Sequence, residues 1–119
     1  MANARGIDIA YLYVADLERS IKFYEAAFGL AFERHGPDGA ECALSDGGRF
    51  GFHATHPGEP PQIPGTVIVD LRVDDLDASR TRLVGLGTRV SEDQTVPTGR
   101  LFAFTDPDGY RLQVIAKTS

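Results

Sequence analysis

The chain has 119 residues, a length expected to fold as one domain, with 12 basic and 17 acidic side chains and a formal net charge of −5. This acidic balance, without a basic cluster, argues against sequence-independent binding of nucleic acid. The single cysteine, Cys42, excludes a disulfide within the chain and favours a reducing compartment. No apolar run approaches membrane-spanning length, and the N-terminus has no signal-peptide core, so a cytoplasmic protein without a membrane partner is expected.

The first half of the chain is predicted to form a strand, a helix and three further strands. Residues 7–14 are rich in β-branched and aromatic side chains, which favours a strand. Asp16 is typical of a helix N-cap and Gly29 fits the left-handed position that ends a helix, so a helix is expected over 17–28. The further strands are expected at 30–34, 41–45 and 49–55, with turns at 35–39 and 46–48.

The second half is predicted to repeat this order. Four prolines within residues 56–65 indicate a linker, because proline at this density excludes regular strand pairing. A strand over 66–73 is expected next, followed by an N-cap at Asp75 and a helix that begins at Leu76 and is closed by Gly87. The remaining elements are expected to be a short strand at 88–91, a loop at 92–99, and a hairpin of strands 101–104 and 112–115.

The hairpin is the strongest local signal in the sequence. Two apolar runs flank the tetrapeptide Asp106-Pro107-Asp108-Gly109, in which proline presets φ for a tight turn and glycine accepts a positive φ. Gln113 is the polar residue of the last run, and in a strand its side chain points away from the face of Leu112 and Val114.

An internal duplication organises the whole chain. The phrases VADLERS at 14–20 and VDDLDAS at 73–79 lie about half the chain apart, and each precedes three predicted strands. The sequence therefore predicts an α+β fold: two βαβββ units, about 5–55 and 66–117, within one domain spanning 1–119. We expect their strands to form a mixed eight-stranded sheet that curls around a cavity, with the helices outside.

The motifs YVADLERSIKFYEAAFGL (13–30) and FTDPDGYRLQVI (104–115) resemble those of the vicinal oxygen chelate superfamily. That superfamily includes glyoxalase I, extradiol dioxygenases and bleomycin resistance proteins. The resemblance extends over essentially the whole chain and implies a small-molecule ligand and a homodimer. Strand alternation alone leaves open whether the half-sheets close within one chain or across two.

In metal-dependent members, the resemblance implies four ligand positions, in the first and last strand of each unit. In this sequence the positions are Ile9, Gly51, Ile68 and Gln113. Isoleucine cannot bind a cation, and an amide is a poor substitute for the glutamate that the family places at the fourth position. Because a catalytic divalent site normally keeps three protein ligands, we expect no metal and no cofactor.

Strand alternation also predicts which side chains line the cavity. The inward-facing set is Ile9, Tyr11, Tyr13, Gly51, His53, Ile68, Asp70, Arg72, Arg111, Gln113 and Ile115. Phenols, an imidazole, a carboxylate, guanidinium groups and an amide among aliphatic residues are typical of a small-molecule site. The candidate ligand-binding residues are Tyr11, Tyr13, His53, Asp70, Arg72, Arg111 and Gln113.

Each candidate also has a structural interpretation. His53 is either a catalytic base or a hydrogen-bonded lining residue. Asp70 and Arg72 either recognise a polar substrate or form an ion pair. Tyr11 and Tyr13 either stack on a flat ligand or fill the cavity or a dimer contact.

Two functions follow from these alternatives. The first is metal-independent binding of a small molecule, as in sequestration of an antibiotic. The alternative is a lyase, isomerase or dioxygenase of the same fold that uses His53 as general base or an atypical metal site.

Overall fold

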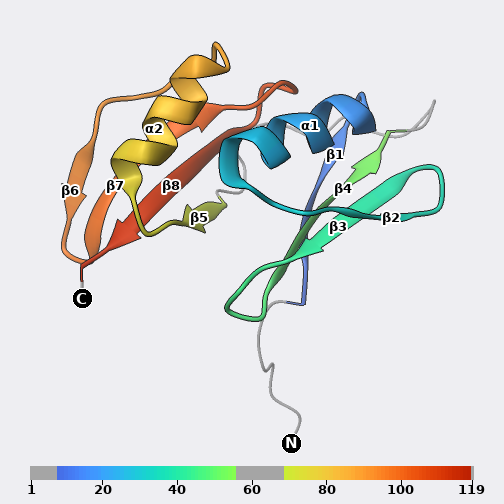
Figure 1. Cartoon of the computed structure of the whole chain (residues 1–119), viewed down its shortest axis with the longest axis horizontal. Helices are drawn as coiled ribbons and strands as arrows, with labels where there is room; N and C mark the ends of the chain where they lie inside the picture. Colours follow the sequence, from blue (N-terminus) through green and yellow to red (C-terminus); the bar gives the residue numbers. More distant parts are fainter. Residues whose placement is uncertain (1–7, 56–68, 119) are drawn as a thin grey trace, which may run out of the picture. The chain divides into compact units, whose positions relative to one another are not determined.

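The computed structural model describes residues 8–55 and 69–118. Its elements are β1 (Ala10–Val14), α1 (Leu17–Phe28), β2 (Glu33–His35), β3 (Gly39–Ala43), β4 (Arg49–Ala54), β5 (Asp70–Arg72), α2 (Leu76–Gly85), β6 (Gln94–Val96), β7 (Gly99–Thr105) and β8 (Arg111–Lys117) (Figure 1). The order strand, helix, three strands occurs twice, so the predicted α+β class is confirmed. The predicted linker, 56–65, lies outside the described residues.

The eight strands form two four-stranded mixed sheets. The strand orders are β1-β4-β3-β2 and β5-β8-β7-β6, so each sheet pairs the first strand of its half with the last. That pairing is parallel in both sheets, and the other pairings are antiparallel. Contacts divide the described residues into two compact units, 8–25 with 29–55 and 26–28 with 69–118. Each unit has its own sheet.

The predicted helix 17–28 is confirmed, with both of its ends as expected. The Asp16 carboxylate accepts a hydrogen bond of 3.1 Å from the amide of Arg19, which satisfies one free donor of the first turn. Gly29 has φ 67° and donates its N–H to the carbonyl of Glu25. Inside the helix, the buried Tyr24 ring lies 5.3 Å from the ring of Phe50 and 5.0 Å from that of Phe52. Thus α1 covers the face of the first sheet that carries Phe50 and Phe52, as the alternation predicts.

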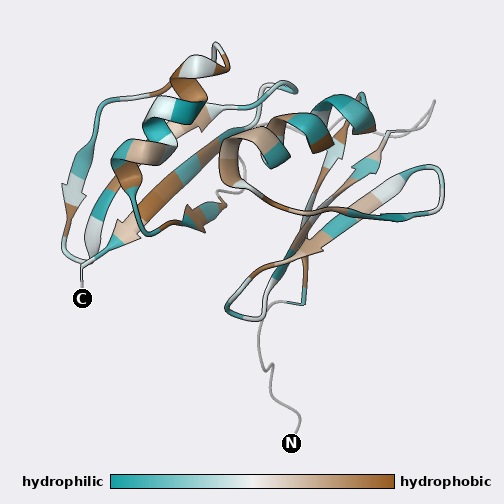
Figure 2. Cartoon of the chain, in the orientation of Figure 1, coloured by the Kyte–Doolittle hydropathy of each residue, from teal (hydrophilic) through white to brown (hydrophobic). Residues whose placement is uncertain are grey.

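The second helix has the same kind of start. The Asp75 carboxylate accepts a hydrogen bond of 3.0 Å from the amide of Ala78, and Gly87, two residues beyond the end of α2, has φ 78°. Leu76 and Leu83 are buried, and α2 lies alongside β7 and β8 (Figure 1). Hydrophobic residues alternate with hydrophilic ones along the first part of β8, as expected for a strand with one covered face (Figure 2).

The first unit departs from the predicted strand bounds at three places. β1 begins at Ala10 rather than at residue 7, which lies outside the described residues. β2 is displaced toward His35, because Phe32 places its ring 5.0 Å from the Phe52 ring before the strand begins. β3 starts at Gly39, two residues early, because His35 pairs directly with Gly39 and the turn is shorter than predicted.

In the second unit, the strand predicted at 88–91 is reduced to a bridge between Val90 and Phe104, and the loop predicted at 92–99 contains β6. Polar contacts of two side chains cause this interruption. Ser91 accepts a hydrogen bond of 2.8 Å from the Ala103 amide with its hydroxyl, and Asp93 then turns toward two arginines. Pairing with β7 resumes only at Gln94. A hydrophobic pattern does not reveal such an interruption.

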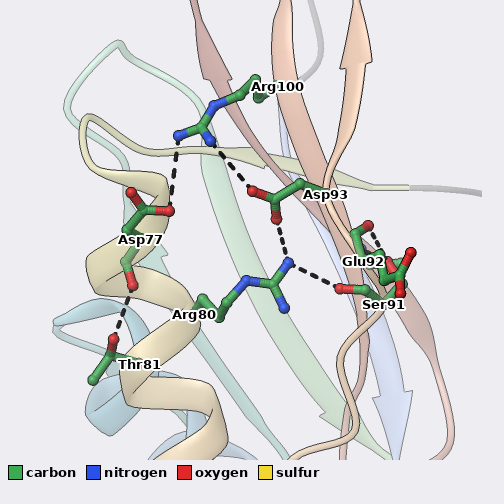
Figure 3. A network of polar contacts seen from close by, with 8 residues as sticks. Asp77, Arg80, Thr81, Ser91, Glu92, Asp93 and Arg100 are labelled. Atoms are coloured by element: carbon green, nitrogen blue, oxygen red, sulfur yellow. Dashed lines mark hydrogen bonds and ion pairs between the residues drawn. The ribbon is translucent and has the colours of Figure 1, made fainter.

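Those arginines belong to a network that ties α2 to the edge of its sheet (Figure 3). Arg80 donates to the Ser91 carbonyl at 2.9 Å and pairs with Asp93, and its guanidinium lies 4.5 Å from the centre of the Phe102 ring. Arg100 lies 3.3 Å from the second oxygen of Asp93.

In the described part of the chain, neither helix is long and apolar enough to cross a membrane.

Candidate functional site

The face of the first sheet that points away from α1 collects the candidate residues of this unit. Strand pairing places Tyr11, Gly51, Glu41 and Glu33 in one row across β1, β4, β3 and β2. The next row contains Tyr13, His53, Gly39 and His35. Paired residues in neighbouring strands point to the same side of a sheet, so both rows lie on this one face, which we call the open face of the first sheet.

An aromatic cluster borders the open face along β1. The rings of Tyr11 and Tyr13 lie 6.0 Å apart at 60°, and the ring of Tyr13 lies 5.4 Å from that of His53. Tyr11 is 51% exposed, whereas Tyr13 and His53 are half-buried. The exposed ring of Tyr11 is therefore available for stacking with a flat ligand.

The hydrogen bond of His53 fixes the tautomer of its neutral ring. Nδ1 lies 2.8 Å from the carbonyl oxygen of Ala54, and a carbonyl can only accept, so Nδ1 must carry the proton. The other nitrogen, Nε2, then holds the lone pair when the ring is neutral. This arrangement suits a hydrogen-bond acceptor or a general base.

A charged cluster on the same face was missed by the sequence analysis. Oε1 of Glu41 accepts from Arg49 at 2.8 Å and lies 3.0 Å from Nε2 of His35. Arg49 also pairs with Asp8 at 2.8 Å, and this hydrogen bond raises the pKa of the guanidinium. The alternation of Glu41 with the buried Ala40 and Cys42 was a usable signal, because it assigns Glu41 to the uncovered side.

Gly51, one of the four expected metal positions, has no room for a side chain. A Cβ atom built there would lie 2.4 Å from the Ala40 carbonyl oxygen and 2.9 Å from Cβ of Glu41. Ile9 is aliphatic, Gln113 offers only an amide, and Ile68 lies outside the described residues. The residues at these positions do not fit a divalent metal ion. Within 8–55 and 69–118, no group of three or more His, Cys, Asp or Glu side chains could hold one.

The candidates of the second unit also share one face. Pairing aligns Asp70 with Gln113 and Ala103, and Arg72 with Ile115 and Leu101. Arg111 follows at the Thr105 position of the same face. Asp70, Arg72 and Arg111 are exposed and Gln113 is half-buried, while α2 covers the opposite face. This sheet thus presents two cationic groups, one carboxylate and one amide.

Comparison with known proteins places these features in a family. Residues 6–114 match the family model of the Glyoxalase/Bleomycin resistance protein/Dioxygenase superfamily. A Mycolicibacterium smegmatis protein described only as uncharacterized is 35% identical over 82 residues, which cover 68% of this chain and 66% of that protein. The match thus spans just under two thirds of that relative's length.

Solved structures show the same fold. A glyoxylase/bleomycin resistance protein/dioxygenase domain from Frankia has a TM-score of 0.78 at 21% identity, covering 98% of this chain and 100% of that one. TnmS3, an antibiotic binding protein from a Streptomyces species, has a TM-score of 0.76 at 24% identity, covering 99% and 100%. A lactoylglutathione lyase from Agrobacterium tumefaciens has a TM-score of 0.75 at 20% identity, covering 96% and 95%.

Proposed function

Because this chain belongs to the Glyoxalase/Bleomycin resistance protein/Dioxygenase superfamily, we propose that it binds a small molecule without a metal ion and acts by sequestration. The observation that carries the proposal is the chemistry of the family's metal positions. Ile9 supplies an aliphatic side chain, Gly51 supplies none, and Gln113 supplies a neutral amide. Recognition must then come from shape, stacking and hydrogen bonds.

The open face of the first sheet supports this proposal. It combines exposed aromatic surface at Tyr11 with a few polar groups, among them His53 and Glu41. Such a mixture is typical of sites that bind small organic molecules. For the second unit, taken by itself, we propose Asp70, Arg72, Arg111 and Gln113 as ligand-binding residues of its own uncovered sheet face. The shared fold of the antibiotic binding protein TnmS3 makes an antibiotic a reasonable class of ligand to test first.

Equilibrium binding to a panel of glycopeptide and aromatic antibiotics tests the proposal. We expect saturable binding of at least one compound, and a Tyr11→Ala variant that weakens it about three- to tenfold through loss of stacking. Val84→Ala is the matched control, because Val84 is an apolar residue of α2 with 56% of its surface exposed. Absence of saturable binding across the whole panel would reject sequestration.

A second candidate function is a lyase or isomerase activity with His53 as general base. It is favoured by the hydrogen bond from Nδ1 to Ala54, which leaves Nε2 as the basic nitrogen of the neutral ring. The test is the turnover of any accepted substrate by His53→Ala. Turnover equal to that of the unaltered chain would eliminate His53 as the base.

We also propose that the chain forms a homodimer, as its resemblance implies. Light scattering coupled to size-exclusion chromatography tests this point. A single species with the mass of one chain at micromolar concentration would contradict it.

A further inference from the structure

Two neighbouring positions on the open face of the first sheet carry no side chain. Gly51 lies between Tyr11 on β1 and Glu41 on β3, and Gly39 lies between His53 on β4 and His35 on β2. The two glycines are diagonal neighbours, a spacing of about 7–8 Å in an antiparallel pair. Together they form a stretch of this face without side chains, buried at Gly51 and half-buried at Gly39, which we call the glycine floor.

Close packing of the strands requires glycine at only one of the two positions of the glycine floor. Any side chain at position 51 would collide with the backbone of β3, since a Cβ would lie 2.4 Å from a carbonyl oxygen. At position 39 a Cβ would make ordinary contacts, the nearest being the His35 carbonyl oxygen at 3.4 Å. Position 39 can therefore carry a methyl group, and its glycine is not required by the packing seen in the structure.

The polar side of the floor offers an acceptor. Arg49 and His35 both contact Oε1 of Glu41, and within the described residues no partner contacts its Oε2. The Glu41 side chain is 20% exposed, so it is partly withdrawn from water yet reachable. An ionised carboxylate has no hydrogen to donate, so a molecule bound beside Oε2 must supply an N–H or O–H group.

The charge of the surroundings points the same way. Glu33 lies beside Glu41 in the same row, and Asp8 pairs with Arg49, so three carboxylates accompany one guanidinium group. His35 is the remaining titratable group facing Glu41 from β2, with 54% of its side chain exposed. An anionic group would be repelled here, whereas an amino group would be attracted.

On the premise that the chain binds a small molecule, we propose that its ligand class is a flat heteroaromatic ring bearing an amino group. The ring lies over the glycine floor beside Tyr11, and its amino group donates to Oε2 of Glu41. The glycines favour a flat ligand, because they leave space for a ring close to the backbone. Glu41 selects a ligand whose edge carries a hydrogen-bond donor. Gly39 and Glu41 are thus specificity-determining residues that no resemblance to the family assigned.

Three ligands with one ring system test this assignment on the full chain. Proflavine carries two amino groups on a flat tricyclic ring, acridine has the same ring without them, and acridine-9-carboxylate adds an anionic group. By fluorescence titration we expect saturable proflavine binding, at least about tenfold weaker acridine binding, and no saturation with the carboxylate.

Three variants locate the binding. Glu41→Gln is expected to weaken proflavine at least about tenfold, and Gly39→Ala at least about fivefold, since a methyl group would lift the ring from the floor. Glu25→Gln, a charge change on the exposed surface of α1, is the control and should leave the affinity unchanged. If Glu41→Gln does not fold, Gly39→Ala still tests whether the ring lies over the glycine floor.

The outcomes separate this inference from the proposed function. Equal binding of all three acridines, or proflavine binding that neither variant weakens, overturns the ligand class while small-molecule binding stands. Binding of other antibiotics with none of the acridines has the same meaning. No saturable binding of any compound overturns both.

Discussion

At position 51, β4 carries no side chain and β3 leaves no room for one. Gly51→Ala would place a methyl carbon within 2.4 Å of the Ala40 carbonyl oxygen, so β3 would have to shift. We expect the free energy of unfolding to fall by about 1–3 kcal/mol, the usual range for overpacking. Urea denaturation followed by circular dichroism measures this change.

Gly39→Ala provides the matched control in the same sheet. A Cβ there meets atoms at 3.4 Å or beyond, so the substitution should leave stability within about 0.5 kcal/mol or raise it slightly by restricting the unfolded chain. Equal losses for the two variants would show that the close approach at position 51 does not constrain the sheet.

The sequence predicts some residues of the open face of the first sheet but not how they neighbour one another, and the difference has a physical origin. Alternation is a local property, so it places Tyr11 and Tyr13 on one side of β1 and Gly51 and His53 on one side of β4. The neighbours of Gly51 depend on the register between β3 and β4, which strand alternation does not specify. Alternation assigns Glu41 to the uncovered side of β3, but its position beside Gly51 follows only from that register.

At the scale of elements, the two helix starts are the clearest agreement between sequence and structure. Asp16 and Asp75 were predicted as N-caps from residue type and position, and each accepts a hydrogen bond from an amide three residues on. The prediction succeeds because capping is local and requires no tertiary contact. The repeated V-x-D phrase therefore encodes the same helix start in both units.

Removing either cap should destabilise the protein measurably. Asp16→Ala and Asp75→Ala are each expected to lower the free energy of unfolding by about 0.5–2 kcal/mol, because one first-turn amide loses its acceptor. The corresponding asparagine variants keep an acceptor oxygen and should retain most of the stability. Alanine variants as stable as the parent in urea denaturation would contradict a capping role.

The interrupted edge of the second sheet shows where local pattern fails. Residues 88–91 look like a strand, yet β6 begins at Gln94, because Ser91 and Asp93 direct the chain into contacts with Ala103 and Arg80. Those contacts join segments that are distant in sequence. A local reading therefore finds the strand count but misplaces this strand.

Arg80 should be the most sensitive member of that network. Arg80→Met removes hydrogen bonds to Ser91 and Asp93 and the contact of the guanidinium with Phe102, so we expect a loss of about 1–3 kcal/mol of stability. Arg80→Lys should recover only part of it, because an ammonium group cannot reproduce the planar fork. Arg82→Met, on the exposed side of the same helix, is the control and should change stability by less than about 0.5 kcal/mol. Comparable losses at both positions would refute the role of the network.

For the whole molecule, the duplication was the decisive sequence feature. Two copies of one phrase, each followed by three strand signals, specify the order of elements, and the structure agrees with that order. The class of ligand is harder to predict from a repeated sequence pattern. The candidate polar residues lie on several strands, and whether a side chain such as Glu41 still has an acceptor atom to offer depends on contacts that the sequence pattern does not reveal.

The absence of suitable ligands at the family's metal positions leads to a test on the intact chain. Protein purified without an affinity tag or chelator should contain no stoichiometric nickel, zinc, iron or manganese by elemental analysis, because Ile9, Gly51 and Gln113 provide no charged donor. A metal ion that binds the folded protein, present at a free concentration 100 times its dissociation constant, would stabilise the folded state by about 2.7 kcal/mol. It would raise the melting temperature by several degrees. We therefore expect the same melting temperature with EDTA and with each added divalent ion. A rise of that size with one ion, or stoichiometric metal in the purified protein, would show that other side chains of this chain form a metal site, and recognition by stacking and hydrogen bonding alone would no longer hold.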